Sequence, residues 1–441
     1  MPRLRQHNPL LVLLNNRPVG RLEKESSGAI HFRYDGLWLA KVDAIPVSLS
    51  LPLREDAYHG ERVTAVFENL LPDSEMLRRR IAEKVGARGI DAFSLLSEIG
   101  RDCVGALQFI SVEEEPPAKQ SKVAGKAVSD PEIEHLLANL ARAPLGLDQE
   151  QDFRISVAGA QEKTALLRFQ GQWLKPQGTT PTTHILKPQI GTLPNGLDLS
   201  DSVENEFYCL RLLAAFGLPV ADVEMHTFGH TKTLVVERFD RRWVETRRLL
   251  RLPQEDCCQA LGYPPSRKYQ NEGGPGVVDI LKLLKAADTP AEDQRLFLKS
   301  QIIFWLIGAT DGHAKNASIF LGPEGRFQLT PFYDVLSAQP SLDSRQIERK
   351  QMKLAMSVGD SRHYRVDEIQ GRHFLQTAVR AGLSRRFAEE TLDAVAASAK
   401  AAFDVVESQL PAGFPMKIHT SIKTAALQRL ELISASIDKA V

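Results

Sequence analysis

The chain has 441 residues, enough for two or three domains at about 150 residues per domain, so a single small module is excluded. Hydrophobic residues make up 43% and charged residues 25%, which is close to globular averages and excludes a disordered chain. Lysine plus arginine (55) equals aspartate plus glutamate (55), so no net charge draws the whole chain to nucleic acid or to a membrane surface.

Cysteine usage and hydropathy indicate a cytoplasmic protein. The four cysteines are too few and too poorly spaced for a disulfide framework or a Cys-x-x-Cys zinc site. The best apolar run, residues 302–309, is far shorter than the roughly 18 residues that a membrane-spanning helix needs. We therefore expect a protein of the reducing cytoplasm that makes no membrane contact.

The first part of the chain predicts a small α+β subdomain over residues 1–112. Apolar residues separated by turn sequences predict three strands, at Leu10–Leu14, 19–22 and Ile30–Tyr34. Apolar residues at helical spacing follow between 63 and 71, and Asp73 is placed to cap a second helix.

A change of composition divides the rest of the chain. Prolines, glutamates and lysines without apolar periodicity predict a linker over 113–129. Asp130, followed by Pro131, then has the pattern of a helix N-cap. Strand-like runs dominate residues 130–240, whereas helical periodicity dominates 241–441. The sequence predicts an α+β protein in which an all-helical lobe follows a β-rich lobe.

Asp311 and Asn316 form the first motif with chemical content. They lie five positions apart in a polar loop after an apolar helix, which is the Asp-x4-Asn spacing of a kinase catalytic loop. In that loop the aspartate accepts or orients the proton of the attacking hydroxyl, and the asparagine holds Mg²⁺. By itself, the spacing is equally consistent with a surface turn.

Asp334 favours the kinase interpretation, because it ends an apolar strand eighteen positions after Asn316. A carboxylate and an amide on neighbouring loops are hard oxygen ligands, which suit a magnesium ion carried by a nucleotide. Separated oxygen ligands of this kind do not suit zinc.

Lys187 is a candidate phosphate ligand in the β-rich lobe. It lies on the short apolar run His184–Pro188, from which a strand can direct its ammonium group at the phosphates. A helix predicted at 202–216 carries Glu204 and Glu206, and we prefer Glu206 as the partner that holds the lysine. A lone strand lysine is more often simply solvated.

Two further segments fit the nucleotide side of a kinase. The small-residue turn at 155–164 lets backbone amides approach phosphate oxygens, although alone it reads as a β-turn. The strand at 234–239 runs toward the helical lobe, where its backbone can bond an adenine edge, with a plain core strand as the alternative.

The order of these pieces resembles the HipA family of serine/threonine kinases, the toxins of bacterial type II toxin-antitoxin pairs. The most specific stretches are residues 152–167, 236–242, 251–256, 273–276 and 308–316. The resemblance extends from the opening strands to the tail, and it implies a two-lobed protein-kinase-like fold with ATP and Mg²⁺ as cofactors.

The resemblance also implies a role for each candidate residue. Asp311 would be the catalytic base, Asn316 and Asp334 would ligate Mg²⁺, and Lys187 would contact the nucleotide phosphates. Besides Lys187 and Asp334, the implied ATP-binding residues are Ala158, Gly159, Ala160, Gln161, Glu162 and Lys163 in the phosphate loop, Glu237, Arg238 and Phe239 on the adenine strand, and His313.

Regulation and partners enter only through the resemblance. It implies that Ser156 is autophosphorylated and that this inactivates the kinase, since a doubly negative phosphate is repelled from a site built for ATP. It further implies glutamyl-tRNA synthetase as the protein substrate, so that translation stops and growth arrests in persistence. The implied partner is a HipB-like helix-turn-helix antitoxin dimer, through which the protein reaches operator DNA as a co-repressor.

The chain departs from ordinary protein kinases. The motifs His-Arg-Asp, Asp-Phe-Gly and Ala-Pro-Glu are absent, with Thr310 before the catalytic aspartate and Val335 after Asp334. Activation-loop control of the common kind is therefore not expected. His226 and His230 have i, i+4 spacing, but Gly229 between them argues against a helical zinc site.

Three alternatives stay open. The tail arginines, Arg380, Arg385 and Arg386, are placed to touch operator phosphates, although a solvated helix face is the favoured interpretation. The same fold and metal ligands also suit a kinase of another protein, of a small molecule or of a lipid. A scaffold that binds antitoxin and DNA without catalysis is the third alternative.

Overall fold

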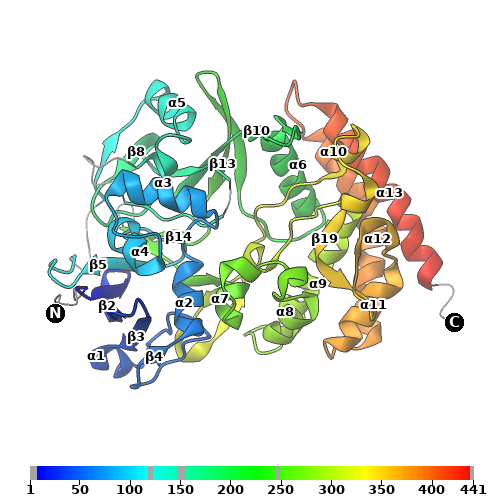
Figure 1. The fold of residues 1–441 in the computed structure, drawn as a ribbon. Helices are drawn as coiled ribbons and strands as arrows, with labels where there is room; N and C mark the ends of the chain where they lie inside the picture. Colours follow the sequence, from blue (N-terminus) through cyan, green and yellow to red (C-terminus); the bar gives the residue numbers. More distant parts are fainter. Residues whose placement is uncertain (1–6, 118–122, 148–153, 160, 245–247, 438–441) are drawn as a thin grey trace. The chain divides into compact units, whose positions relative to one another are not determined.

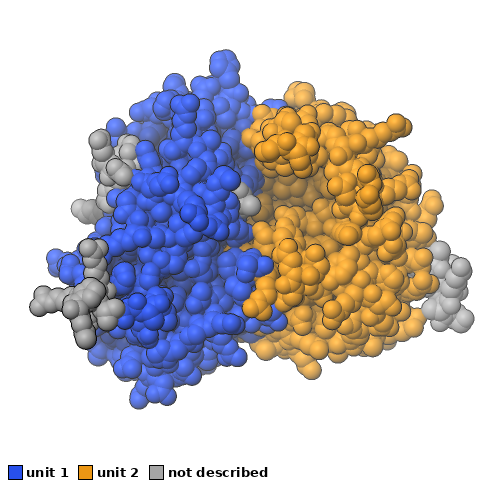
Figure 2. Space-filling view, in the orientation of Figure 1, with its two compact units in different colours: residues 1–188, 226–266, 319–327 blue, residues 189–225, 267–318, 328–441 orange. Residues whose placement is uncertain are grey.

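Figure 1 shows the computed structural model, which describes residues 7–117, 123–147, 154–159, 161–244 and 248–437. The chain forms two compact units, which Figure 2 distinguishes by colour. Unit 1 comprises residues 1–188, 226–266 and 319–327, and unit 2 comprises residues 189–225, 267–318 and 328–441. Each unit is therefore assembled from segments that are distant in the sequence.

Unit 1 begins with an antiparallel sheet of order β4-β3-β2-β1-β5 and four helices that follow its strands. The strands are β1 (Leu10–Leu14), β2 (Arg17–Lys24), β3 (Ile30–Tyr34), β4 (Tyr58–His59) and β5 (Leu107–Ser111), and the helices are α1 (Gly36–Leu39), α2 (Glu61–Glu68), α3 (Glu75–Val85) and α4 (Ala92–Ile99). Alternation along the strands buries Leu22 and Phe32 completely on the core face.

The expected opening strands and helices are confirmed, with one correction. Ser74, rather than Asp73, caps α3, because its Oγ accepts the Leu77 N–H at 3.3 Å. Asp73 and Ser74 are both polar residues that could take this position, and Ser74 makes the hydrogen bond to the Leu77 N–H.

A six-stranded sheet of order β12-β13-β9-β7-β8-β6 follows. Its strands are β6 (Gly125–Ala127), β7 (Thr164–Phe169), β8 (Gln172–Pro176), β9 (His184–Pro188), β12 (Val223–Phe228) and β13 (Thr231–Glu237), and helix α5 spans Asp130–Ala138. Part of the linker expected at 113–129 is thus the edge strand β6, because its backbone pairs with β8, whereas residues 118–122 lie outside the described residues.

Helix α5 begins one residue earlier than expected. Its N-cap is Ser129, not Asp130, and a capping box joins Ser129 to Glu132, whose Oε2 accepts the Ser129 N–H at 2.8 Å. Pro131 still lies in the first turn, where its missing N–H has no cost.

Unit 2 is mainly helical. Its helices are α6 (Ser202–Ala215), α8 (Val277–Leu284), α9 (Pro290–Ile307), α10 (Gln339–Asp343), α11 (Gly371–Arg380), α12 (Arg385–Ser408) and α13 (Met416–Ile437). Helix α9 packs against α6, α8, α12 and α13, which explains why its apolar residues are buried on most faces. Ser384 caps α12 as expected, since its Oγ accepts the Phe387 N–H.

The expectation of an all-helical lobe from residue 241 onward is wrong. Beside helix α7 (Cys257–Leu261), this part contains β14 (Arg241–Val244), β15 (Arg248–Arg251), β16 (Gln254–Asp256), β17 (Ser318–Leu321), β18 (Phe327–Leu329), β19 (Lys353–Val358) and β20 (His363–Arg365). These strands have three to six residues, too short a window for strand periodicity to stand out from the long helices.

The remaining strands β10 (Gly191–Thr192) and β11 (Asp198–Leu199) form a small hairpin in unit 2. The predicted mixed α and β fold is therefore confirmed. None of the helices in the described ranges combines the length and hydropathy needed to span a bilayer.

Candidate active site

The loop that carries Asp311 begins where helix α9 ends. Gly308 adopts φ 69°, the left-handed conformation that ends helices, and the Ala309 N–H returns to the Phe304 carbonyl at 2.8 Å. A Cβ at Gly308 would lie 2.9 Å from Met352 Cε, so a side chain would be strained by the backbone conformation and would require Met352 to shift. The chain then turns sharply and presents Asp311 at the surface.

Backbone contacts fix Asn316 relative to Asp311. The Asp311 carbonyl accepts the His313 N–H at 2.8 Å and the Asn316 Nδ2 at 2.8 Å. Asn316 Nδ2 also lies 3.5 Å from the Asp334 carbonyl. Two carbonyl acceptors orient the amide, because only its nitrogen can donate to them. The amide oxygen of Asn316 is therefore the end available to a cation.

Asp334 occupies a strained position between two anchors. Its φ is 59°, which is unfavourable for a residue other than glycine and is typical of functional sites. Before it, the Tyr333 hydroxyl donates to the Lys315 carbonyl at 2.8 Å. After it, the Ser337 N–H donates to Asn205 Oδ1 at 2.9 Å, and Asn205 Nδ2 donates back to the Ser337 carbonyl at 2.8 Å.

A small pocket in unit 2 joins these residues. It is lined by Phe304, Ala309, Asp311, Gly312, Asn316, Asp334, Val335 and Leu336. Two carboxylic acids and an amide thus share one pocket with apolar walls. The donor set fits Mg²⁺, which takes oxygen ligands, usually one or two carboxylates together with substrate phosphates.

Tyr269 is a site residue that sequence reasoning missed. Its hydroxyl donates to Asp311 Oδ1 at 2.6 Å, and its ring packs edge-on against the ring of the buried His313, with centroids 5.1 Å apart. Tyr269 belongs to a loop without periodicity, so no local signal marked it. It holds the Asp311 carboxylate in place through a hydrogen bond that leaves the second oxygen to other donors.

The predicted phosphate loop lies in unit 1. Gly159 has φ +112°, and a Cβ there would come within 2.6 Å of Lys163 Nζ, which donates to the Ala158 carbonyl at 2.9 Å. Gln161 Nε2 donates to the Pro188 carbonyl at 3.3 Å. Glu162 pairs with Arg80 at 3.3 Å, and Ala160 lies outside the described residues.

The Ser156 hydroxyl is enclosed by the N-terminal subdomain. The residue has no exposed surface, and its Oγ donates to the Leu70 carbonyl at 2.7 Å. The Ser156 N–H donates to the Asp102 carbonyl at 3.0 Å. A bridge between Pro72 and Gly159 joins the same turn to the segment that contains Leu70. The turn is thus fixed to the subdomain at several points.

Lys187 is buried on β9, opposite Leu234 of β13, and Glu237 lies opposite His184 on the same strand pair. Glu204 and Glu206 are buried in α6 of unit 2. The pairing expected between Lys187 and Glu206 joins the two units and stays a prediction.

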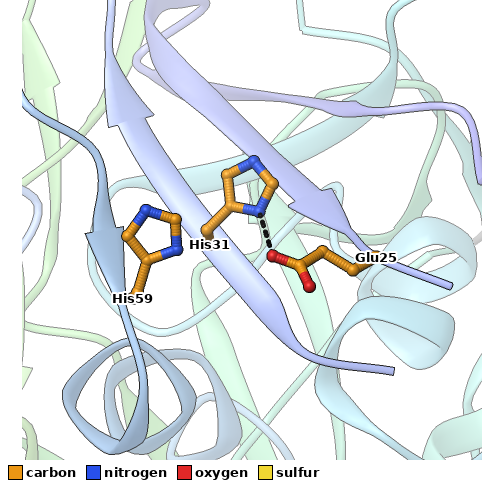
Figure 3. Close-up of side chains that lie close together, drawn as sticks. All are labelled: Glu25, His31 and His59. Carbon is orange, nitrogen blue, oxygen red and sulfur yellow. Dashed lines mark ion pairs between the residues drawn. The ribbon is translucent and has the colours of Figure 1, made fainter. Parts of the chain in front are cut away.

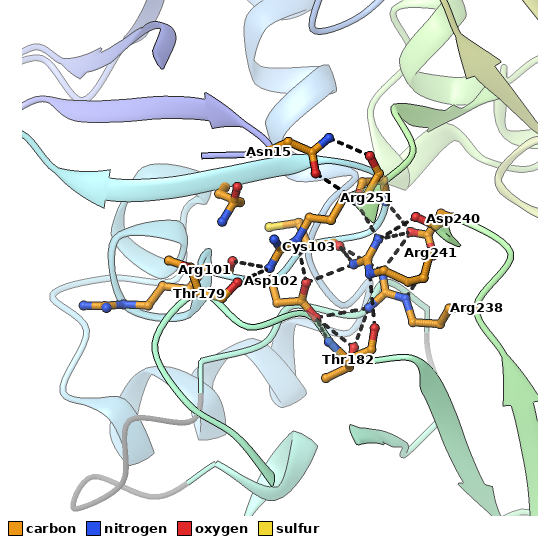
Figure 4. Close-up of polar contacts among 12 residues, drawn as sticks. Asn15, Arg101, Asp102, Cys103, Thr179, Thr182, Arg238, Asp240, Arg241 and Arg251 are labelled. Carbon is orange, nitrogen blue, oxygen red and sulfur yellow. Dashed lines mark hydrogen bonds and ion pairs between the residues drawn. The ribbon is translucent and has the colours of Figure 1, made fainter. Parts of the chain in front are cut away.

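A buried ionic cluster follows the end of strand β13 in the chain (Figure 4). The Asp102 cluster comprises Asp102, Arg238, Asp240, Arg241 and Arg251, each 8% exposed or less. Asp102 Oδ1 accepts from Arg241 at 2.9 Å and from Arg251 at 3.0 Å. Asp240 Oδ2 lies 2.8 Å from Arg238 and 2.9 Å from Arg241. Three guanidinium groups therefore share two carboxylates.

Charge decides the protonation of this cluster. Burial raises the pKa of Asp102, but the charges of Arg241, Arg251 and Arg238 outweigh burial and hold it well below its usual range. Burial and the charge of Arg238 lower the pKa of Arg241 to about 10 despite its two carboxylate partners. All members are thus charged near neutral pH.

The cluster changes how Arg238 is to be interpreted. Its guanidinium group donates to Asp240, Asp102, Thr182 and the Cys103 carbonyl. Its backbone N–H donates to the Thr183 carbonyl at 2.9 Å. Arg238 thus holds the end of strand β13 in place. Phe239, the next residue, packs edge-on against Phe320 with centroids 5.9 Å apart.

Two family models match this chain. "HipA N-terminal domain" matches residues 10–110, and "HipA-like C-terminal domain" matches residues 155–403. The chain is 36% identical to Y4mE of Sinorhizobium fredii, which is named as a kinase, with 79% of this chain and 80% of that protein covered. It is 30% identical to the serine/threonine-protein kinase toxin HipA of Shewanella oneidensis, with 79% and 78% covered.

A solved structure has the same fold. It is the complex of HipA, HipB and operator DNA from Shewanella oneidensis, matched with a TM-score of 0.81 at 26% identity over 98% of each chain. The kinase-like fold expected from the sequence is confirmed by this match.

Proposed function

Because the chain belongs to the HipA family of kinases, we propose that it is an ATP- and Mg²⁺-dependent protein serine/threonine kinase and the toxin of a toxin-antitoxin pair. The observation that carries this proposal is the pocket in unit 2 that Asp311, Asn316 and Asp334 share. In that pocket an exposed carboxylate lies beside two oxygen ligands of the kind that a nucleotide-borne magnesium ion takes.

Asp311 acts as the base. It accepts the proton of the substrate hydroxyl while the hydroxyl oxygen bonds to the γ phosphorus and ADP leaves. Tyr269 keeps the carboxylate oriented through its 2.6 Å hydrogen bond. Asn316 and Asp334 would hold Mg²⁺, which would supply positive charge to offset the negative charge that develops during transfer.

The remaining predicted residues act on the nucleotide. Lys187 and the backbone of the loop at 158–163 contact the phosphates, and His313 lies beside the nucleotide. Glu237 and Phe239 take the adenine, with Arg238 in a supporting role because its polar groups are engaged in the Asp102 cluster.

Ser156 is the autophosphorylation site in this proposal. Its complete burial supports a switch, because the 2.7 Å bond to Leu70 leaves no room for a phosphoryl group on the same oxygen. A phosphate of charge near −2 would keep the turn from returning to that position. Phosphorylation would therefore displace the loop and stop catalysis.

The proposed target is glutamyl-tRNA synthetase, whose phosphorylation halts translation and promotes persistence, and the proposed partner is a HipB-like antitoxin dimer. The matched complex of Shewanella oneidensis, which contains HipA, HipB and operator DNA, supports an antitoxin through which the protein reaches operator DNA as a co-repressor. Such a target and partner place the protein in the cytoplasm.

The test is intact-mass spectrometry of the purified full-length protein before and after incubation with Mg²⁺ and ATP. We expect a gain of phosphate at Ser156 that an Asp311→Ala variant lacks. If the protein starts unphosphorylated, binds ATP and gains no phosphate, the proposal of a serine kinase is contradicted. The alternatives of a metabolite kinase and of a scaffold without catalysis would then remain. Incubation with glutamyl-tRNA synthetase then tests the target separately.

A further inference from the structure

One row of polar side chains crosses the outer face of the first sheet of unit 1. Glu23 of β2 lies directly opposite His31 of β3, and His31 lies directly opposite His59 of β4. Residues directly opposite one another share a face of the sheet, here the face away from the buried Leu22 and Phe32. The row thus brings two imidazoles and a carboxylate together at the edge of the sheet.

Glu25 completes the group from the turn that follows β2 (Figure 3). Its Oε1 lies 3.8 Å from His31 Nδ1, and its Oε2 accepts from Ser27 at 3.1 Å. The rings of His31 and His59 are stacked, with centroids 5.2 Å apart and an interplanar angle of 29°. One ligand atom from each of Glu25, His31 and His59 lies within 4.8 Å of the others.

Glu23 sets the orientation of His31. Its Oε2 lies 3.1 Å from His31 Nε2, and because a carboxylate accepts hydrogen bonds, this contact favours the tautomer with the proton on Nε2. The other nitrogen, Nδ1, is buried and makes no hydrogen bond to any described residue. A carboxylate on one imidazole nitrogen and an unused lone pair on the other is the arrangement found around metal-binding histidines.

We propose that Glu25, His31 and His59 bind a divalent transition-metal ion of the zinc type, with Glu23 as the residue that positions His31. Two histidines and one glutamate form a known zinc ligand set, with water in the fourth position. Tetrahedral zinc with bonds of about 2.0–2.2 Å places its ligand atoms about 3.4 Å apart. The side chains reach this spacing by small rotations, which the exposed Glu25 and His59 are free to make.

The surroundings affect both affinity and selectivity. Arg21 and Arg33, paired on the same face of β2 and β3, oppose a cation, and the two glutamates of the site offset them. All four cysteines are buried, so thiolates do not compete for zinc. A bound ion would join the turn after β2, strand β3 and the two-residue edge strand β4.

The test is calorimetric titration of the untagged full-length protein with Zn²⁺ alone, supported by the visible absorption of bound Co²⁺. We expect one ion per chain, at least tenfold weaker binding in His31→Gln and His59→Gln, and a smaller loss in Glu23→Gln, within the roughly 10- to 100-fold known for such second partners. The matched control is His363→Gln, which removes one member of another stacked histidine pair, with centroids 4.0 Å apart.

Each outcome decides the proposal. Loss of Zn²⁺ affinity and of the tetrahedral Co²⁺ spectrum in both histidine variants, with an unchanged circular dichroism spectrum and an unchanged His363→Gln control, supports the site. Wild-type affinity in either histidine variant, or no binding by the natural protein, overturns it. Equal loss in the His363→Gln variant overturns it as well, because binding would then be nonspecific.

Discussion

Asp102 and Asp311 show two different environments of a carboxylate in one protein. Asp102 is 2% exposed and bonds three arginines in unit 1, whereas Asp311 is exposed in unit 2, where the Tyr269 hydroxyl donates to its carboxylate. A buried acid whose oxygens are all engaged cannot receive a proton or a ligand without losing its partners. An exposed acid with one oxygen held by a hydrogen bond has its other oxygen available to a proton or a ligand. The arrangement of the partners therefore distinguishes a structural carboxylate from one that can take part in chemistry.

The largest effect is expected where Asp102 is removed. Asp102→Ala leaves three buried guanidinium groups with only Asp240 to compensate them, so the free energy of unfolding should fall by about 3–5 kcal/mol. Urea unfolding measures this loss. The control is Asp367→Ala, which removes an exposed partner of Arg365 and should change stability only slightly. Equal losses in the two variants would refute the distinction.

Asp311→Asn should lower the reaction rate and leave stability unchanged, the reverse of what is expected for Asp102→Ala. We expect the rate of autophosphorylation to fall about a thousandfold or more, equivalent to roughly 4 kcal/mol of activation free energy, because the asparagine cannot take up the proton. The melting temperature should stay unchanged, since the side chain is exposed. Single-turnover assays with labelled ATP give the rate, with the exposed Asp360→Asn as control. A rate close to that of the natural protein would remove Asp311 from the mechanism.

Glu255 extends the comparison to a buried acid that makes no ion pair with any residue in the described part of the chain. Burial raises its pKa to about 8, against the Leu49 N–H that donates to it at 2.8 Å. Because the folded-state pKa exceeds the unfolded value of about 4.5, the folded protein retains a proton that the unfolded chain loses between these pH values. Stability should therefore fall by about 3 kcal/mol as pH rises from 5 to 8.

Glu255→Gln isolates this contribution. The glutamine keeps an oxygen for the Leu49 N–H but does not ionise, so the fall in stability between pH 5 and pH 8 should be smaller by that amount. Urea unfolding of both proteins at the two pH values gives the difference. An identical pH dependence in the two proteins would show that Glu255 titrates normally.

The smallest effect is expected at Tyr269. Tyr269→Phe removes the hydrogen bond to Asp311 but keeps the ring against His313, so the phosphorylation rate should fall about three- to tenfold without loss of stability. The control is Tyr263→Phe, because Tyr263 also lies between α7 and α8 but belongs to unit 1. An unchanged rate in Tyr269→Phe would mean that Asp311 keeps its orientation through its backbone contacts alone.

Local patterns explain which features the sequence could predict. Strands β1 and β3 follow from alternation and turns, and the Asp311 loop follows from an apolar helix closed by Gly308. Asp311 and Asn316 lie close enough in the chain that one loop must carry both. The outcome is different for Asp102, which meets Arg251 across 149 positions of sequence.

Long-range partners were not predictable from such patterns. Nothing in the composition of the stretches around Arg238 and Arg251 indicates that an aspartate from the first subdomain pairs with them. Tyr269 was missed for the same reason, since its contact with Asp311 depends on how two distant loops meet. The roles of Lys187 and Glu206 depend on contacts of this kind and stay predictions.

The alternation of the chain between the two units has a consequence for synthesis on the ribosome. Unit 1 is complete only when residue 327 has been made. At about 5–20 residues per second, translation from residue 188 to that point takes on the order of ten seconds. During the first part of this interval, strand β9 lacks its neighbour β13. Asp102 also lacks its arginine partners, so it either stays exposed to water or is buried without a compensating charge. The nascent chain therefore presents an open strand edge and an unneutralised acid until the Arg238–Arg251 segment emerges.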